Sequence, residues 1–268
     1  MMHRNTTFAL AFVAAAAGMG CVGDTGEDLI HFAAFAGGAL GASNGTYAFE
    51  SGRGYQVELT RARLHVGAMY LNRSRPSDVV SDTTCTLAGI YVAEVTSGLD
   101  VDALNPELQR FPADGFATTE RAITGELWLS GGEIDVVGDP TVILDVAGRA
   151  TKQGDGYPFE GRFTIGANRV VVPSDPALPG REPICKQRVV TPIGTDIVPS
   201  AEGGLVLRID PKGWFGNVDF KTLDEDPGDP ALYRFADEES NQASNSLYDG
   251  LHASGGVYSF EWDEGGGP

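Results

Sequence analysis

One pentapeptide in the sequence has the spacing of a serine hydrolase. Gly41-Ala42-Ser43-Asn44-Gly45 fits the pattern Gly-x-Ser-x-Gly, and His252 lies downstream of Ser43, as a Ser–Asp–His chain order requires. A nucleophile elbow needs a helix after the serine, whereas residues 46–54 contain two glycines and alternating aromatic residues. We therefore expect a Gly/Ser/Asn turn at Ser43, and a serine esterase is the alternative enzymatic interpretation.

Four side chains with nitrogen or sulfur ligands are candidates for a metal site: His31, His65, Met69 and His252. Imidazole and thioether ligands together suit copper. On one strand His65 and Met69 would share a face but lie about 13 Å apart at ~3.3 Å per residue. A shared site therefore requires a bulge at Gly67. The alternative is that these histidines are surface or polar-face strand residues without a metal.

Two further patterns point to ligands. The run Asp224-Glu225-Asp226-Pro227-Gly228-Asp229 offers hard oxygen ligands for calcium, although the spacing and the distal Glu of an EF-hand are missing. In an acidic chain such a run is more often a solvated loop. Trp128, Trp214 and Trp262 could stack on a sugar, but tryptophans on strands more often pack in the core or across strands.

The N-terminal segment is typical of an export signal. Residues 1–5 carry one positive charge, and residues 6–17 form a small-to-apolar run that is too short to span a membrane as a helix. The next residues, Gly18-Met19-Gly20-Cys21, resemble a bacterial lipobox, with Gly18 at the position where Leu is usual. An ordinary cleaved signal peptide is the alternative interpretation.

The lipobox resemblance implies that residues 1–20 are a signal peptide and that Cys21 is acylated and anchors the chain to a membrane. Residues 21–28, rich in Gly, Asp and Glu, then form a tether. Val22 follows the cysteine where Asp often marks retention in the inner membrane. The resemblance therefore implies an outer-membrane lipoprotein, facing the periplasm or the cell surface.

Two cysteines remain if Cys21 carries lipid, namely Cys85 and Cys185. Paired cysteines persist as disulfides in an oxidising compartment, so we expect a bridge that joins the 73–84 loop to the 173–184 loop. Two free buried thiols are the alternative. A zinc site is not expected, because neither cysteine has another Cys or a His within four residues.

The composition is that of a globular and strongly acidic protein. The 268 residues include 37 Asp and Glu against 19 Lys and Arg, so the formal net charge is −18. Hydrophobic residues make up 42% and charged residues 21%, which excludes a disordered chain or a coiled coil. Nucleic-acid binding needs stripes of basic residues that the sequence lacks, so no nucleic-acid partner is expected.

Alternation of apolar and polar residues with a period of two predicts β-strands along most of the chain. The apolar set changes face at Arg61-Ala62, which divides one long strand into two parts. Strands at this spacing, separated by Gly, Pro and Asp turns, indicate an all-β, antiparallel β-sandwich with long irregular loops. The predicted strands lie within residues 55–66, 90–95, 123–129, 142–147, 159–165, 205–209 and 257–262.

One short C-terminal helix is predicted over residues 240–251. Ala243, Leu247 and Leu251 recur every four residues and form one apolar stripe. We find no internal repeat and no linker within residues 29–263, so one β-sandwich domain is expected there, followed by a flexible tail at 264–268.

Two short stretches resemble known exported proteins. Residues 59–71 (LTRARLHVGAMYL) resemble an early strand pair of uncharacterised exported β-rich lipoproteins from predatory soil bacteria, and residues 207–215 (LRIDPKGWF) resemble a late strand and turn of the same group. Both are more distantly similar to the methanobactin-binding periplasmic family, which is β-rich and associated with copper. This resemblance implies copper as a possible cofactor but assigns no ligand.

The sequence therefore predicts a lipid-anchored envelope protein with a non-catalytic binding or structural role, whose ligand or protein partner it does not identify. Metal binding, with copper ahead of calcium, is the alternative, and a serine esterase acting through Ser43 is a second alternative.

Overall fold

The structure is a computed structural model that describes residues 29–75, 89–130, 141–165, 188–237 and 241–265. The predicted signal peptide and tether, which include Cys21, lie outside these residues, as do Cys85 and Cys185. Within the described ranges, no helix has the length and apolar character that crossing a membrane would need.

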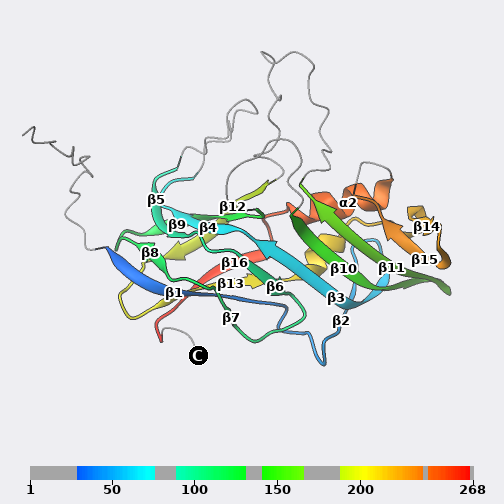
Figure 1. Ribbon diagram of the computed structural model, residues 1–268, viewed down its shortest axis with the longest axis horizontal. Coiled ribbons are helices and arrows are strands. Elements are labelled where there is room, and N and C mark those ends of the chain that lie inside the picture. Colours follow the sequence, from blue (N-terminus) through cyan, green and yellow to red (C-terminus); the bar gives the residue numbers. More distant parts are fainter. Residues whose placement is uncertain (1–28, 76–88, 131–140, 166–187, 238–240, 266–268) are drawn as a thin grey trace, which may run out of the picture.

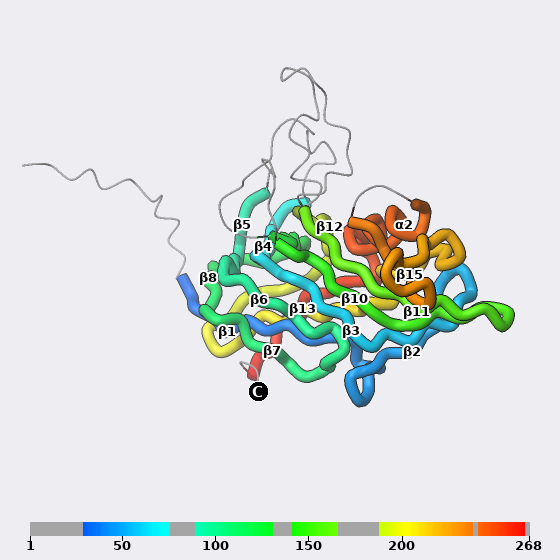
Figure 2. Tube along the Cα trace, turned by 45° about the vertical axis from the view of Figure 1, so that its right-hand side comes forward, coloured from blue at the N-terminus to red at the C-terminus, as the bar shows by residue number. Residues whose placement is uncertain are grey.

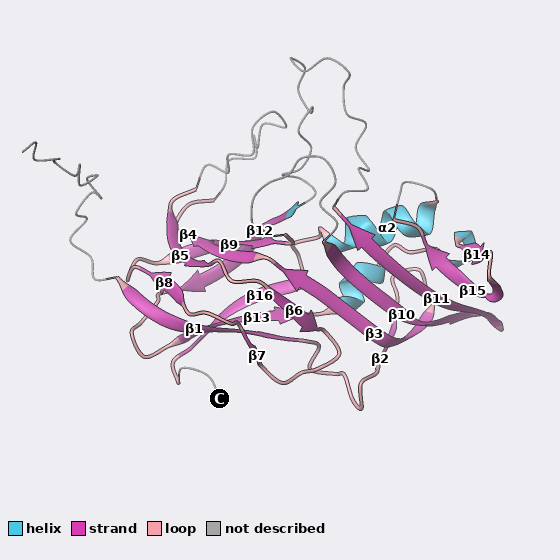
Figure 3. Ribbon diagram, viewed as in Figure 1, coloured by secondary structure: helices cyan, strands magenta, loops and turns pink. Residues whose placement is uncertain are grey.

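The described chain is mostly β-structure, arranged in two sheets with one C-terminal α-helix (Figure 3). The all-β class and the short helix predicted from the sequence are confirmed. The nine-stranded sheet contains β1 (Ile30–Gly37), β4 (Ala68–Asn72), β5 (Tyr91–Val95), β7 (Gln109–Arg110), β8 (Gly115–Ala117), β9 (Ala122–Trp128), β12 (Val189–Ile197), β13 (Gly204–Ile209) and β16 (Tyr258–Asp263). The seven-stranded sheet contains β2 (Tyr47–Glu50), β3 (Gln56–Val66), β6 (Leu99–Asp102), β10 (Val142–Lys152), β11 (Asp155–Thr164), β14 (Asp224–Asp226) and β15 (Asp229–Phe235).

The nine-stranded sheet curls until its two ends nearly meet (Figure 1). Its strand order is β12-β9-β4-β5-β8-β1-β13-β16, with β7 paired to β1. At the open seam, the hydroxyl of Thr195 on β12 donates a hydrogen bond to the carbonyl of Phe260 on β16 over 3.3 Å. The pairing of β1 with β13 is parallel, unlike the antiparallel arrangement predicted; their long separation along the chain leaves room for the crossover that a parallel pair needs.

The seven-stranded sheet extends beside the nine-stranded one, with the helical segments packed next to it (Figures 1 and 2). Its order is β14-β15-β11-β10-β3-β2, with β6 on β3, and β15 runs parallel to β11. The helical segments are the 3₁₀ turns η1 (Pro211–Phe215) and η2 (Phe220–Thr222) and the α-helix α2 (Gln242–Leu251).

The long strand β3 shows how the alternation of the sequence fixes its two faces. Val57 and Leu59 are buried before Thr60, and Leu64 and Val66 are buried after it. The register with β10 shifts by one residue at Thr60, which is the change of face predicted at Arg61-Ala62. A β-bulge therefore keeps the apolar side chains on the core side along the whole strand.

The helix α2 buries the stripe that the sequence predicted. Ala243, Leu247 and Leu251 are completely buried. The side chain of Asn241 caps the first turn by accepting a hydrogen bond from the Ser244 amide over 2.8 Å. This cap explains why the helix begins just after Asn241.

One hydrophobic cluster includes side chains from both sheets, from η1 and η2 and from α2. Its aromatic part lies against β11, where the ring of Phe159 contacts three other phenylalanine rings. Two of these, Phe215 and Phe220, come from the 3₁₀ turns and stack with their planes 10° apart. The 3₁₀ turns are therefore core elements, and they also determine where the polar residues between them lie.

Candidate functional site

A pocket of about 410 Å³ opens where the loop before β3, the β10–β11 hairpin and η2 meet. We call it the basic pocket. Its lining residues are Arg53, Tyr55, Lys152, Gln153, Asp155, Tyr157, Asp219 and Lys221. They come from three regions of the chain that are far apart in sequence.

Local structure holds two of these regions in place. A two-residue turn, in which Gln153 has φ 54° and Gly154 φ 97°, closes the β10–β11 hairpin and sets Lys152 opposite Asp155. In the loop before β3, Gly52 lies so close to Gly216 that a Cβ atom would be 2.5 Å from the Gly216 carbonyl oxygen. A side chain at Gly52 would therefore push this loop away from the helical segments.

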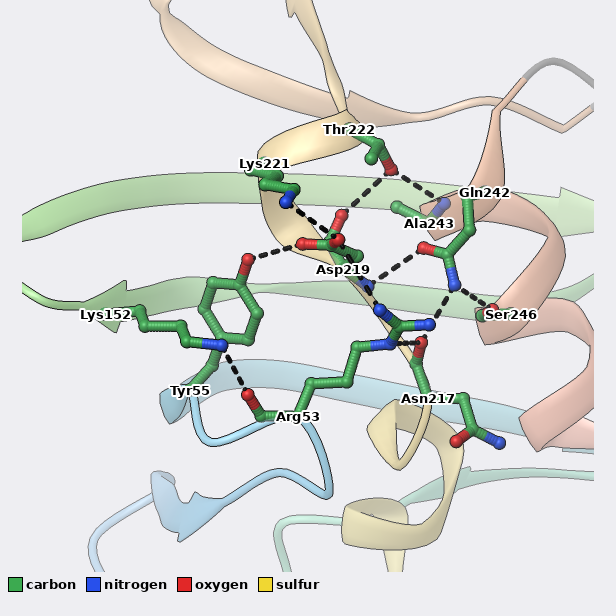
Figure 4. Close-up of polar contacts among 10 residues, drawn as sticks. All are labelled: Arg53, Tyr55, Lys152, Asn217, Asp219, Lys221, Thr222, Gln242, Ala243 and Ser246. Carbon is green, nitrogen blue, oxygen red and sulfur yellow. Dashed lines mark hydrogen bonds and ion pairs between the residues drawn. The ribbon is translucent and has the colours of Figure 1, made fainter.

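Asp219 is the centre of the polar contacts in the basic pocket (Figure 4). The phenol of Tyr55 donates a hydrogen bond to Asp219 Oδ1 over 2.5 Å. Arg53 Nη1 and Lys221 Nζ lie 3.5 and 3.6 Å from Asp219 Oδ2. Partial burial would raise the pKa of Asp219, but the Tyr55 hydrogen bond and the two cations together hold this pKa below its ordinary value. Asp219 is therefore a fixed negative charge.

Lys152 contacts an aromatic ring and a backbone carbonyl group. Its ammonium group lies 4.7 Å from the centre of the Tyr55 ring and donates a hydrogen bond to the Arg53 carbonyl over 2.6 Å. Burial, with the hydrogen bond to Asp219, raises the pKa of Tyr55 to about 12. Tyr55 therefore remains a neutral hydrogen-bond donor next to Lys152.

The chain matches no protein-family model, no curated protein and no solved structure. The resemblance to exported lipoproteins and to the methanobactin-binding family therefore stays a prediction. The function of the basic pocket has to be inferred from its own side chains.

The candidate serine lies in a tight turn. Ser43 and Thr46 form an isolated β-bridge, and the two residues between them, Asn44 and Gly45, have φ angles of 54° and 73°. The chain then enters β2 and not a helix, so the turn predicted here is confirmed. His252 follows α2, where its Nδ1 lies 2.8 Å from the Tyr248 carbonyl oxygen.

The proposed pair of His65 and Met69 is divided between the two sheets. His65 is on β3 and its Nδ1 lies 2.6 Å from the carboxylate of Asp100 on the neighbouring strand β6. The chain passes into the nine-stranded sheet at Gly67, and Met69 on β4 is completely buried in the core. The structure therefore does not bring the thioether of Met69 to the surface where His65 lies.

The other two candidate histidines are on separate elements. His31 is on β1, with its ring 4.6 Å from that of Phe116, whereas His252 follows α2. The start of β1 lies at the left edge of the described chain in Figures 1 and 2, whereas α2 lies right of the centre. Among the described residues, no three His, Cys, Asp or Glu side chains are grouped as metal ligands. Copper binding stays a prediction without an assembled site.

The acidic run at residues 224–229 is a β-hairpin between β14 and β15. Asp226 is 6% exposed and its Oδ1 accepts hydrogen bonds from the amides of Gly228 and Asp229 over 2.6 and 3.0 Å. Its other oxygen pairs with Arg234. The carboxylate at the centre of the run thus stabilises the turn, and calcium binding there stays a prediction.

The three tryptophans lie in different places. Trp214 is completely buried and its indole donates to the hydroxyl of Tyr258 over 3.2 Å. The indole of Trp262 donates to the Ser200 hydroxyl over 3.2 Å, and Trp128 is half-buried at the end of β9. Trp214 is a core residue, so the three do not form one sugar-stacking surface.

Sequence patterns place Glu126 on the polar face of β9, but the structure buries it completely. Its carboxylate accepts a hydrogen bond from the amide of Asn72 over 2.9 Å and a longer one, 3.4 Å, from the indole of Trp128. Burial raises the pKa of Glu126, and these two hydrogen bonds only partly oppose the shift. Among the described residues, the buried Oδ1 of Asn72 has no hydrogen-bond partner.

Glu126→Gln should stabilise the protein at neutral pH. The raised pKa means that the folded state favours the protonated carboxyl, so the contribution of Glu126 to stability is complete below its unfolded pKa and is lost as pH rises through the folded pKa. We expect a gain of about 1–3 kcal/mol near pH 8, where a buried charge is removed, and almost none near pH 4. Urea unfolding at both pH values measures this difference. Glu94→Gln, at an exposed carboxylate on β5, is the matched control and should leave the free energy of unfolding unchanged at both pH values. An equal gain at both pH values for Glu126→Gln would contradict the charge explanation.

Proposed function

We propose that the protein is a lipid-anchored, non-catalytic binding protein of the bacterial envelope and that the basic pocket is its binding site. The observation that carries this proposal is the convergence of Arg53, Lys152 and Lys221 on one pocket of about 410 Å³. A volume of this size, set between loops on a β-framework, is in the range of small-molecule sites.

The composition of the pocket favours binding over catalysis. Its eight lining residues, all in the described part of the chain, include no Ser, Thr, Cys or His. The tyrosine that contacts Asp219 has its pKa raised to about 12 and is therefore a poor nucleophile at neutral pH. Fixed charges, a neutral phenol and an aromatic wall can select and orient a ligand, and these are the features of a binding site.

The N-terminal sequence supports the envelope location. The short apolar run followed by Cys21 resembles a lipoprotein signal, and residues 22–28 would connect the lipid to β1, which begins at Ile30. Val22 favours transfer to the outer membrane by the same resemblance. The anchor would keep the pocket in the envelope, where an exported small molecule meets it.

Mass spectrometry of the protein expressed in a bacterium with lipoprotein processing should find an acylated Cys21 as the N-terminus. The expected mass gain is that of a diacylglycerol group with or without one further acyl chain, and the protein should fractionate with membranes. The Cys21→Ser variant should lack the lipid and leave the membrane fraction. An unmodified N-terminus at Val22 or beyond would contradict the anchor.

A further inference from the structure

The basic pocket carries an excess of positive charge in a strongly acidic protein. Lys152 and Lys221 are two of the four lysines in the chain. Together with Arg53 they provide three positive charges against the two carboxylates of Asp155 and Asp219, so the lining has a formal charge of 3 − 2 = +1. The whole chain has a charge of −18, so an anion that approaches it meets attraction here and repulsion over most of the surface.

The partners of the three cations position them and neutralise only part of their charge. Lys152 contacts a carbonyl oxygen and an aromatic ring, neither of which carries a formal charge. Arg53 donates its Nε hydrogen to the Asn217 carbonyl over 2.8 Å. Arg53 and Lys221 share one carboxylate at 3.5 and 3.6 Å, distances at which the pairing is electrostatic and not a short hydrogen bond. Donor hydrogens on these groups therefore remain available to a ligand.

A group of arginines elsewhere in the molecule provides a useful contrast. On the outer face of the seven-stranded sheet, arginines and carboxylates alternate in an ion-pair network of Arg61, Arg162, Arg234, Asp145, Glu160 and Asp226. Here three cations match three carboxylates across neighbouring strands, as in a cross-strand charge ladder. That network is locally neutral, and the basic pocket is not.

We infer, resting on the binding role proposed above, that the basic pocket takes a tetrahedral oxyanion, a phosphate or sulfate group on a small molecule. Such a group has several acceptor oxygens and up to two negative charges, which suit one guanidinium and two ammonium groups. Lys152 and Lys221 line the pocket from two different elements: Lys152 is at the β10–β11 hairpin and Lys221 is on η2 (Figure 4). The half-buried ring of Tyr157 forms a wall against which the rest of the small molecule can pack.

Inorganic phosphate and sulfate are the probes that test this inference. The full chain carrying Cys21→Ser, which has no lipid to interfere, is titrated with each anion at low ionic strength by calorimetry and by thermal unfolding. Sodium chloride at matched ionic strength is the reference. We expect saturable binding and a rise in melting temperature with phosphate and sulfate that chloride does not produce.

Charge-removing variants locate the binding. Lys152→Met removes the ammonium group that lies over the Tyr55 ring but keeps an unbranched side chain of similar length. Lys221→Gln changes an exposed side chain, so at least one of these variants should fold normally. Each should weaken phosphate binding about tenfold, which is the loss of one charge-assisted hydrogen bond. Lys212→Met is the matched control, because Lys212 is an exposed lysine on η1 outside the pocket, and it should bind phosphate like the parent chain. Equal weakening by all three, or no saturable binding above the chloride reference, would overturn the inference.

The same chain distinguishes a free ligand from a lipid headgroup. Phosphatidylglycerol vesicles present the same phosphate chemistry on a surface, with phosphatidylcholine vesicles as the reference. We expect no sedimentation with either, because the acidic exterior repels an anionic bilayer while a small anion enters the pocket. Sedimentation with phosphatidylglycerol that free phosphate reverses would support the oxyanion class and assign the headgroup as its source. Phosphate binding by the Cys21→Ser chain, together with an unmodified N-terminus of the parent chain in mass spectrometry, would support the pocket and contradict the anchor, so the two proposals fail separately.

Discussion

Phe159→Ala should reduce the free energy of unfolding by about 3–5 kcal/mol, the range for truncating a fully buried phenylalanine. Phe159 is 1% exposed on β11. Its ring centre lies 5.7, 5.1 and 5.4 Å from those of Phe215, Phe220 and Phe235. The residual cavity would lie where a sheet meets both 3₁₀ turns, so neighbouring side chains cannot easily close it. Urea unfolding followed by tryptophan fluorescence measures the change.

Phe116→Ala is the matched control for this prediction. Phe116 is 40% exposed on β8 and its ring contacts His31 at the surface. We expect a loss of about 1 kcal/mol or less, since little apolar area leaves the interior. Similar losses for the two variants would show that the aromatic cluster is not the core of this part of the fold.

Cys85→Ser and Cys185→Ser should each lower the melting temperature by a similar amount, through loss of the disulfide predicted between them. A bridge between these residues closes a span of 100 residues. The chain-entropy model assigns such a loop ~4.7 kcal/mol, less any strain in the folded state. Thermal unfolding of protein purified from an oxidising compartment measures the effect, and a reducing agent should shift the parent chain toward the variants.

The double variant provides the decisive comparison for the disulfide. If the two cysteines act only through one bond, Cys85→Ser combined with Cys185→Ser should be little less stable than either single variant. Additive losses from the two single variants would instead indicate two independent buried thiols, which is the alternative that the sequence leaves open.

The sequence determined the β-strands and the C-terminal helix because their signals are local. Alternation along residues 55–66 predicted both faces of β3 and the position at which they change, which the register with β10 confirms as a bulge at Thr60. The apolar stripe of Ala243, Leu247 and Leu251 likewise predicted α2. Burying such a pattern on one side requires no knowledge of which element will cover it.

Glu126 marks the limit of that local signal. Alternation placed it correctly on the face of β9 opposite the core-facing Leu127, together with Trp128. A period of two specifies which face a side chain occupies but not what lies over that face. The burial of Glu126, and hence the direction of its pKa shift, therefore depends on tertiary packing.

The basic pocket was decided by tertiary structure alone. Arg53, Lys152 and Lys221 are separated by 152 − 53 = 99 and 221 − 152 = 69 residues, and no motif connects them. They meet because the β3–β10 pairing brings the loop of Arg53 beside the β10–β11 hairpin, and because Phe215 and Phe220 bury the 3₁₀ turns that carry Asp219 and Lys221 against the same sheet. Sequence periodicity reports the environment of neighbouring residues. A site built from three distant segments exists only after long-range strand pairing and core packing have brought those segments together.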